Sequence, residues 1–146
     1  MYEYGCKVSR VVDGDTIDAE LDLGFNIIHK CRVRLYGIDT PESRTRNKDE
    51  KARGKLATKF LQDAISNGKN VVLQTQLKDS KGKFGRVLAS VIVDGININQ
   101  QMVTSHMAVR YEGQSKENIQ LEHLKNRDIL IKEGLHTLIE NANTKT

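Results

Sequence analysis

The chain has 146 residues, of which 38% are hydrophobic and 29% are charged, and its formal net charge is +4. This composition is typical of one soluble globular domain and excludes a disordered chain. No apolar run approaches the roughly 18 residues of a membrane-spanning helix, and no secretory leader precedes the first strand pattern. We therefore expect one domain over residues 1–146 that ends in a flexible tail after about residue 136. As written it is cytoplasmic, or exported if a leader has been removed.

The first part of the chain predicts a three-stranded meander. Residues 4–12 alternate loosely and stop at Asp13-Gly14, which is typical of a tight hairpin turn. Residues 16–22 resume the strand pattern, and residues 27–36 return after a turn near Leu23-Gly24. These three segments form consecutive antiparallel strands.

The rest of the chain predicts three helices and two more strands. Residues 49–67 have apolar side chains at helical spacing, although Gly54 favours a loop for the first turns. Strands at 70–76 and 86–94 follow, then helices at about 97–107 and 116–133, the last with Ile119, Leu124, Ile131 and Leu135 on one face. This order is that of a five-stranded OB-type β-barrel, so we predict an α+β fold.

Charge and cysteine content carry limited information about partners. Residues 44–94 hold 12 basic and 5 acidic side chains, whereas residues 1–43 hold 5 basic and 8 acidic ones. Either a polyanion binds the basic segment, or the segment is a solvated helix face with a mobile loop, which charge alone favours. Cys6 and Cys31 form no C-x-x-C motif, and we expect free, partly buried thiols. The basic cluster comprises Arg44, Arg46, Lys48, Lys51, Arg53, Lys55 and Lys59.

Three short motifs hold the residues that suggest chemistry. The first is Asp13-Gly14-Asp15-Thr16, which by itself makes only a hairpin turn. The second runs from Arg32 to Glu42, and strand alternation places Arg32, Arg34 and Tyr36 on one face before Asp39 and Glu42 follow in a turn. The third is Lys83-Phe84-Gly85-Arg86, at the start of the last predicted strand.

Together these motifs supply what metal-assisted phosphodiester hydrolysis needs. Aspartate and carbonyl oxygens select Ca²⁺ or Mg²⁺ rather than Zn²⁺. Arginine forks bind phosphate through two parallel hydrogen bonds and offset charge that develops on phosphorus. A further carboxylate near the metal can orient or deprotonate an attacking water.

At these residues the sequence resembles the staphylococcal nuclease (thermonuclease) family, over roughly residues 4–135. Asp13-Gly14-Asp15-Thr16, the Arg34–Glu42 segment and Phe84-Gly85-Arg86 are similar to its three signatures and occur in the same order. The resemblance implies an OB-fold, Ca²⁺-dependent nuclease that cuts the P–O5′ bond of DNA and RNA with little sequence specificity and leaves 3′-phosphates. Mg²⁺ is a less favoured metal, no membrane partner is implied, and we expect a monomer.

The resemblance also implies roles for individual residues. Asp15 and Asp39 would bind Ca²⁺ through carboxylates and Thr40 through its carbonyl, while Arg34 and Arg86 would hold the scissile phosphate. Glu42 would act on the attacking water. Its position alone permits three roles: outer-shell support of the metal, activation of the water, or a structural bond to Arg34 or Arg86. Lys83, Phe84 and Tyr111 would contact the nucleotide. Phe84 stands where many members have tyrosine, and Gly82 replaces an acidic residue often found there.

Two alternatives to a nuclease remain. One is a non-catalytic OB-fold module that binds single-stranded nucleic acid or a protein, and the other is a structural protein in which the Arg–Asp groups are buried ion pairs. Histidine-centred mechanisms are disfavoured, because the four histidines are scattered and no Ser or Cys nucleophile lies at a telling spacing. We interpret His29 as a strand surface residue, and His123 and His136 as helix surface residues.

Overall fold

In a computed structural model, which describes residues 2–76 and 87–135, five strands close into a barrel. These are β1 (Tyr2–Asp13), β2 (Thr16–Asp22), β3 (Ile28–Leu35), β5 (Val71–Thr75) and β6 (Val87–Val93). Neighbours pair in the order β3-β2-β1-β5-β6, and a parallel pairing of β3 with β6 closes the sheet. The predicted α+β fold with an OB-type barrel is confirmed. The predicted flexible tail after about residue 136 lies outside the described residues.

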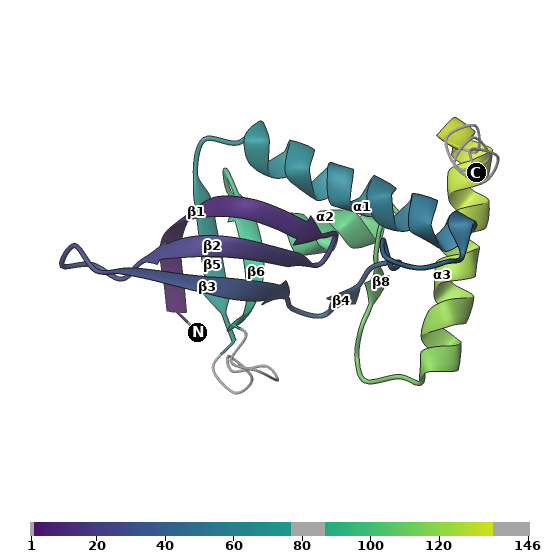
Figure 1. Cartoon of the computed structure of the whole chain (residues 1–146), viewed down its shortest axis with the longest axis horizontal. Coiled ribbons are helices and arrows are strands. Elements are labelled where there is room, and N and C mark those ends of the chain that lie inside the picture. Colours follow the sequence, from purple (N-terminus) through teal and green to yellow (C-terminus); the bar gives the residue numbers. More distant parts are fainter. Residues whose placement is uncertain (1, 77–86, 136–146) are drawn as a thin grey trace.

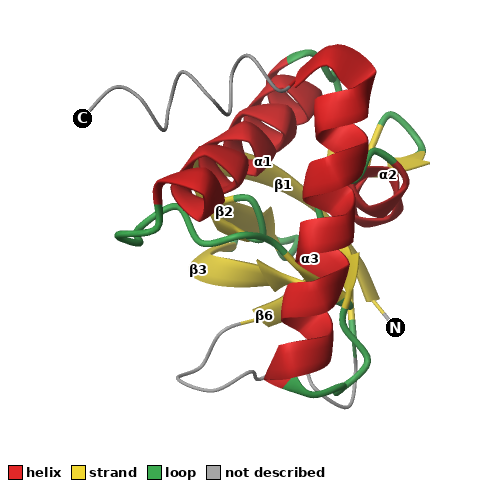
Figure 2. Ribbon diagram, turned by 90° about the vertical axis from the view of Figure 1, so that its right-hand side faces the viewer, coloured by secondary structure: helices red, strands yellow, loops and turns green. Residues whose placement is uncertain are grey.

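Three helices cover the barrel, as predicted. Helix α1 (Lys48–Ser66) packs along β1, α2 (Ile98–Thr104) lies beside β6, and α3 (Lys116–Leu130) contacts the short strand β8 (Val109–Arg110). Figure 1 shows α1 running over the barrel and α3 crossing its end, and Figure 2 shows α3 upright in front of the strands. After α3 the chain makes a widened turn over Ile131–Leu135. Among the described residues, no helix is long and apolar enough to cross a membrane.

The core forms because alternate strand residues point inward. On β2, Ile17, Ala19 and Leu21 are all less than 4% exposed, while the residues between them face outward. Helices add one apolar stripe each. The largest side chains with almost no exposed surface are Ile17, Leu35, Leu61, Leu73, Met102, Val33 and Val91.

Three features differ from the sequence prediction. Strand β4 (Ile38–Asp39) pairs with β8, and β7 (Ile96–Asn97) pairs with β6; these two-residue strands are too short for a detectable alternation. Helix α1 is helical from Lys48 onward despite Gly54, because the Asn47 side chain caps it by accepting from the backbone N–H of Glu50 (3.0 Å).

The face of the last helix was also predicted wrongly. His123 and Leu130 are its buried residues, whereas Ile131 is 38% exposed and Ile119 and Leu124 are only partly buried. His123 and Leu130 lie seven residues apart and therefore share a face. Because His123 is polar, it interrupts the apolar pattern on the buried face. The prediction therefore assigned burial to a different side of the helix.

Candidate active site

A pocket of about 540 Å³ opens where β4, the chain leading to α1 and the start of α3 meet. Arg34, at the end of β3, lies at its edge. The pocket is lined mostly by polar side chains that come from distant parts of the sequence. Its lining residues are Arg34, Asp39, Thr40, Pro41, Glu42, Glu50, Tyr111, Gln114, Lys116, Ile119, Gln120 and His123.

Asp15 and Arg34 meet because the β1–β2 turn lies beside the end of β3. The Leu35 backbone N–H donates to the carbonyl of Asp15 (2.8 Å), which fixes the two segments together. The Arg34 guanidinium then lies 2.9 Å from the Asp15 carboxylate through Nη1 and 3.6 Å from the Asp39 carboxylate through Nη2. One planar cation therefore spans both predicted metal-binding carboxylates.

Gly14 allows this turn to approach α1 and β4. A Cβ at Gly14 would lie 2.8 Å from the Cβ of Ala57 and 3.0 Å from Cγ2 of Thr40. The glycine is therefore required for space, not only for the hairpin turn that its sequence predicts. Thr40 is held close in return, since its backbone N–H donates to the Asp15 carboxylate (3.3 Å).

The Asp39 carboxylate is bonded to a histidine that was predicted to lie on the helix surface. His123 on α3 is 4% exposed, and its Nε2 lies 2.8 Å from Oδ2 of Asp39. Because an ionised carboxylate can only accept a hydrogen bond, this nitrogen carries the proton. The prediction that His123 is a helix surface residue is therefore wrong. His29 is exposed as predicted, and His136 lies outside the described residues.

Glu42 is positioned by contacts on both sides of its backbone. Its N–H donates to the Glu50 carboxylate (3.3 Å), and the next residue, Ser43, donates its hydroxyl to Asp13. A Cβ at Gly54 would lie 2.6 Å from the carbonyl carbon and oxygen of Glu42. Helix α1 can pack directly on this loop only because residue 54 is glycine, which explains a residue that costs about 1 kcal/mol of helix propensity.

Burial raises the pKa of the Glu42 carboxyl, and the nearby charges of Asp15, Asp13, Asp39 and Glu50 raise it further. These groups form a region of excess negative charge in which Arg34 is the cation that contacts Asp15 and Asp39. Among the described residues, the ion-pair partners of Arg34 are those two aspartates and not Glu42.

This donor set fits a hard divalent cation. Carboxylate oxygens converge on one positive group, and repulsion among the remaining carboxylates would be relieved by added positive charge. The described residues contain no cluster of three or more His, Cys, Asp or Glu side chains placed to hold a metal. A metal here would thus take at most two such side chains from the described residues, and its remaining ligands from other oxygen atoms, including those of water or substrate.

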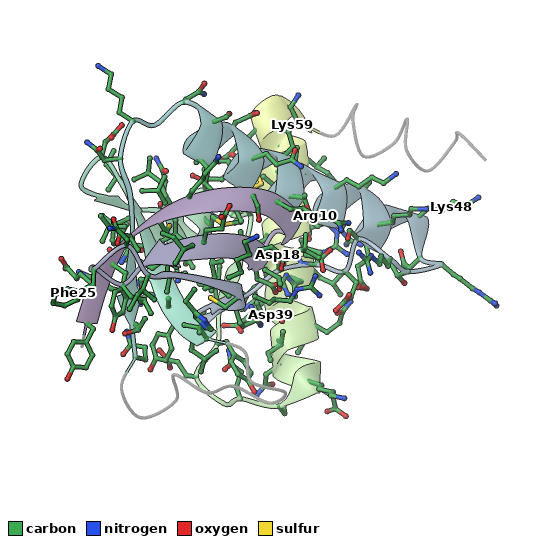
Figure 3. All side chains as sticks on the ribbon, turned by 60° about the vertical axis from the view of Figure 1, so that its left-hand side comes forward. Arg10, Asp18, Phe25, Asp39, Lys48 and Lys59 are labelled. Carbon is green, nitrogen blue, oxygen red and sulfur yellow. The ribbon has the colours of Figure 1, made fainter. Side chains whose placement is uncertain are left out.

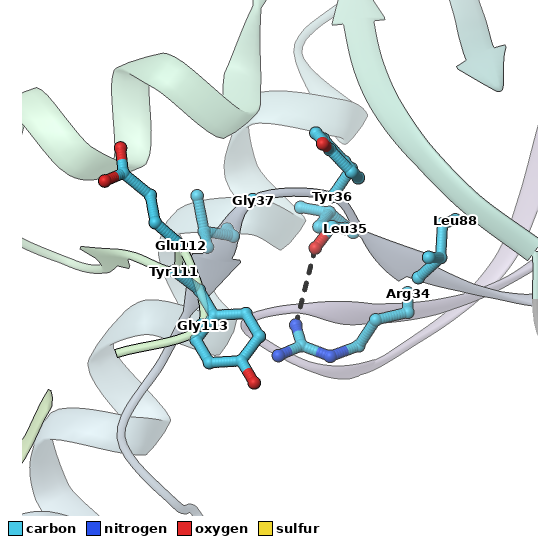
Figure 4. A pocket seen from close by; sticks show the side chains of 9 residues that line it. Arg34, Leu35, Tyr36, Gly37, Leu88, Tyr111, Glu112 and Gly113 are labelled. Carbon is cyan, nitrogen blue, oxygen red and sulfur yellow. Dashed lines mark hydrogen bonds between the residues drawn. The ribbon is translucent and has the colours of Figure 1, made fainter. Parts of the chain in front are cut away.

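Tyr111 faces Arg34 from the opposite side of a second, adjoining pocket of about 410 Å³. Figure 4 shows the Tyr111 ring and the Arg34 guanidinium pointing toward one another, and Nη1 of Arg34 bonded to the Leu35 carbonyl (3.5 Å). Tyr111 is 48% exposed, and its backbone N–H donates to the carbonyl of Gly37 (2.8 Å). An exposed aromatic ring beside a guanidinium group is suited to stacking on a nucleic-acid base.

The third predicted motif cannot be placed. Lys83, Phe84 and Arg86 lie outside the described residues, as does Gly82. The residue that follows Arg86, Val87, pairs with Val33 on β3, next to Arg34. Leu88, the next residue along the chain, lines the adjoining pocket of about 410 Å³ together with Arg34.

One member of the predicted basic cluster is not at the surface. Arg53 is 4% exposed, and its Nη2 lies 3.5 Å from the carboxylate of Asp49, which also contacts Arg127 of α3 (3.6 Å). Its Nε and Nη1 have no hydrogen-bond partner among the described residues. Burial lowers the pKa of this guanidinium. Arg53 thus belongs to the contact between α1 and α3, because it occupies the buried side of α1.

Comparison with known proteins points to one family. A model of the family described as staphylococcal nuclease homologues matches residues 32–136. An uncharacterised protein of Bacillus anthracis is 38% identical over 99 residues, which cover 68% of this chain and 44% of that protein.

Two relatives have names that state an activity. A thermonuclease of Staphylococcus intermedius is 35% identical over 101 residues (69% of this chain, 56% of its own), and an uncharacterised endonuclease of Haemophilus influenzae is 36% identical over 121 residues (83% and 60%). The chain thus spans about half the length of these three relatives.

Proposed function

Because the chain belongs to the staphylococcal nuclease family, we propose that it is a Ca²⁺-dependent endonuclease that hydrolyses DNA and RNA. The observation that carries this proposal is the position of Arg34, which lines one pocket with Asp39 and Glu42. Its guanidinium contacts the carboxylates of both Asp15 and Asp39. Metal-assisted phosphodiester cleavage requires two acidic groups for the metal, a guanidinium that binds the phosphate, and a further carboxylate that acts on the water.

The proposed roles of individual residues follow the family resemblance. Asp15, Asp39 and the Thr40 carbonyl would hold the metal, which supplies positive charge against the phosphate oxygens. Arg34 would bind the scissile phosphate together with Arg86, which lies outside the described residues. Tyr111, with Lys83 and Phe84, would contact the nucleotide. We expect the protein to act as a monomer.

In the proposed reaction Glu42 takes a proton from a water molecule. The water oxygen forms a bond to phosphorus as the P–O5′ bond breaks, and the departing 5′ oxygen ends as a hydroxyl after it gains a proton. The products are a 3′-phosphate and a 5′-hydroxyl. Glu42 suits this step because its carboxylate borders the pocket and, among the described residues, has no ion pair with Arg34.

The direct test is incubation of the protein with plasmid DNA and with RNA. We expect cleavage with Ca²⁺, weaker cleavage with Mg²⁺ and none with EDTA, and mass spectrometry of a cut oligonucleotide should find 3′-phosphates. Asp39→Ala should be inactive and should lose Ca²⁺ binding in calorimetry. Tight DNA binding without cleavage would instead favour the non-catalytic binding module, and unchanged Ca²⁺ binding by Asp39→Ala would exclude this metal site.

A second prediction concerns His123. Removing its N–H frees the Asp39 carboxylate to rotate, so we expect His123→Ala to weaken Ca²⁺ binding by about tenfold or more, measured by calorimetry. His123→Gln keeps a donor and should recover most of the affinity, whereas His29→Ala, at an exposed histidine, should have no effect. If the Ala variant binds Ca²⁺ as tightly as the wild type, His123 does not orient Asp39.

A further inference from the structure

Helix α1 presents a stripe of three lysines to solvent, formed by Lys51, Lys55 and Lys59. They lie four residues apart, so they follow one another along one side of the helix, and all three are exposed. The opposite side carries the buried residues Arg53, Gly54, Ala57 and Leu61. Figure 3 shows Lys48 at the start of this helix and Lys59 further along it, both pointing away from the barrel.

The charge of this stripe is not neutralised by the helix that carries it. Asp49 is held by Arg53 and Arg127, and Glu50 accepts from the backbone N–H of Glu42. None of the three stripe lysines forms an ion pair with a described residue, although Asp63 lies one turn beyond Lys59. The acidic residues at the start of α1 therefore serve the packing of the site, and positive charge remains on the outer side.

The stripe starts next to the candidate active site. Glu50, in the first turn of α1, lines the same pocket as Glu42, and Gly54 packs on the Glu42 backbone. Two exposed arginines, Arg44 and Arg46, occupy the short segment between Glu42 and the helix. Positive charge thus continues from the pocket along the outer side of α1 as far as Lys59.

The spacing of the lysines matches a nucleic-acid backbone. At 1.5 Å per residue, consecutive stripe lysines are about 6 Å apart along the helix axis. The phosphates of one strand of a duplex advance about 3.4 Å each, so each lysine would meet roughly every second phosphate.

We propose that Lys51, Lys55 and Lys59 bind the phosphate backbone of the nucleic acid that flanks the segment in the active site. This inference rests on the proposed function, and it adds a second binding surface that contributes affinity without base specificity. It predicts that long substrates bind more tightly than short ones and that the difference depends on salt.

The test compares two variants that lose the same charge. One has Lys51, Lys55 and Lys59 replaced by Gln; the control has Lys7, Lys30 and Lys69 replaced by Gln, all exposed and outside α1. Binding of a fluorescein-labelled DNA duplex of about three turns is measured in EDTA, so that no cleavage occurs, over about 50–200 mM salt. We expect the stripe variant to bind at least about tenfold more weakly, with a salt slope reduced by about 2–3, because each lost phosphate contact removes about 0.9.

The outcomes separate the stripe from the nuclease proposal. Cleavage of a dinucleotide, which is too short to reach α1, should be the same in wild type and stripe variant. Equal duplex affinity and slope in the two triple variants would overturn the stripe even if all three proteins cleave DNA. If the wild type cleaves nothing while the stripe variant still binds the duplex more weakly than the control variant, the stripe is supported and the nuclease proposal is refuted. Lost binding to phosphatidylserine vesicles with unchanged duplex binding would assign the stripe to membranes and overturn the proposal.

Discussion

Arg34→Lys should lower kcat/KM by at least about 100-fold, the largest loss we expect from a substitution that keeps the charge. The guanidinium reaches Asp15 through one terminal nitrogen and Asp39 through the other, at 2.9 and 3.6 Å. A lysine ammonium is a single point and cannot span both carboxylates or bind a phosphate through two parallel bonds. Arg86→Lys should cause a loss of similar size.

Arg32→Lys is the matched control for this experiment. Arg32 lies two residues earlier on the same strand and pairs with Asp18 at the surface, where its side chain is 50% exposed. The same chemical change there should alter kcat/KM by less than about threefold, because an exposed ion pair contributes little. Single-turnover rates with a labelled oligonucleotide measure both variants. An Arg34→Lys enzyme as active as Arg32→Lys would show that Arg34 does not bind the scissile phosphate.

Glu42→Gln and Glu42→Asp should each lower kcat by about 100-fold or more, while Ca²⁺ and nucleotide binding stay within a few-fold of wild type. The Gln variant removes the charge in nearly the same shape, and the Asp variant withdraws the carboxylate by one methylene. The loop that carries Glu42 is fixed by Glu50, Asp13 and the close packing of Gly54, so it cannot move to compensate.

The two variants together distinguish water activation from an anchoring role. If Glu42 only bonded an arginine, Gln should work better than Asp, because its amide oxygen still accepts a hydrogen bond. An active Gln variant at saturating Ca²⁺ would therefore end the general-base assignment. Glu122→Gln, at an exposed glutamate of α3 outside the pocket, controls for the loss of one negative charge.

Stability measurements should show that these losses are not caused by unfolding. The pKa of Glu42 is raised in the folded protein, so its ionised form opposes folding above that pKa, and the effect vanishes below the pKa of the unfolded chain. In the absence of metal, Glu42→Gln should therefore raise Tm by about 1–3 °C near neutral pH and leave it unchanged in acid. If Glu42→Gln instead had a lower Tm than the wild type at neutral pH, repulsion between Glu42 and the neighbouring carboxylates would be contradicted.

Much of this protein could be predicted from local sequence. The five barrel strands were placed within a few residues, because alternation at β2 and the Asp13-Gly14 turn are short-range signals. The motifs that hold Asp15, Arg34, Asp39 and Glu42 also lie within short segments, and the structure brings these residues to one pocket or to a partner in it. Their roles remain predictions.

Only the tertiary structure identified the residues that support the site. His123 lies 84 positions from Asp39, and a histidine on an amphipathic helix has no local signal that it faces a carboxylate. Arg53 belongs by sequence to a basic cluster, yet it is buried where α1 meets α3. Gly54 looks like a helix breaker until the Glu42 backbone is placed against it. In each case the deciding contact joins segments that are distant in sequence. The periodicity of apolar residues shows only which side of a helix or strand is apolar, and it does not show which segment packs against that side.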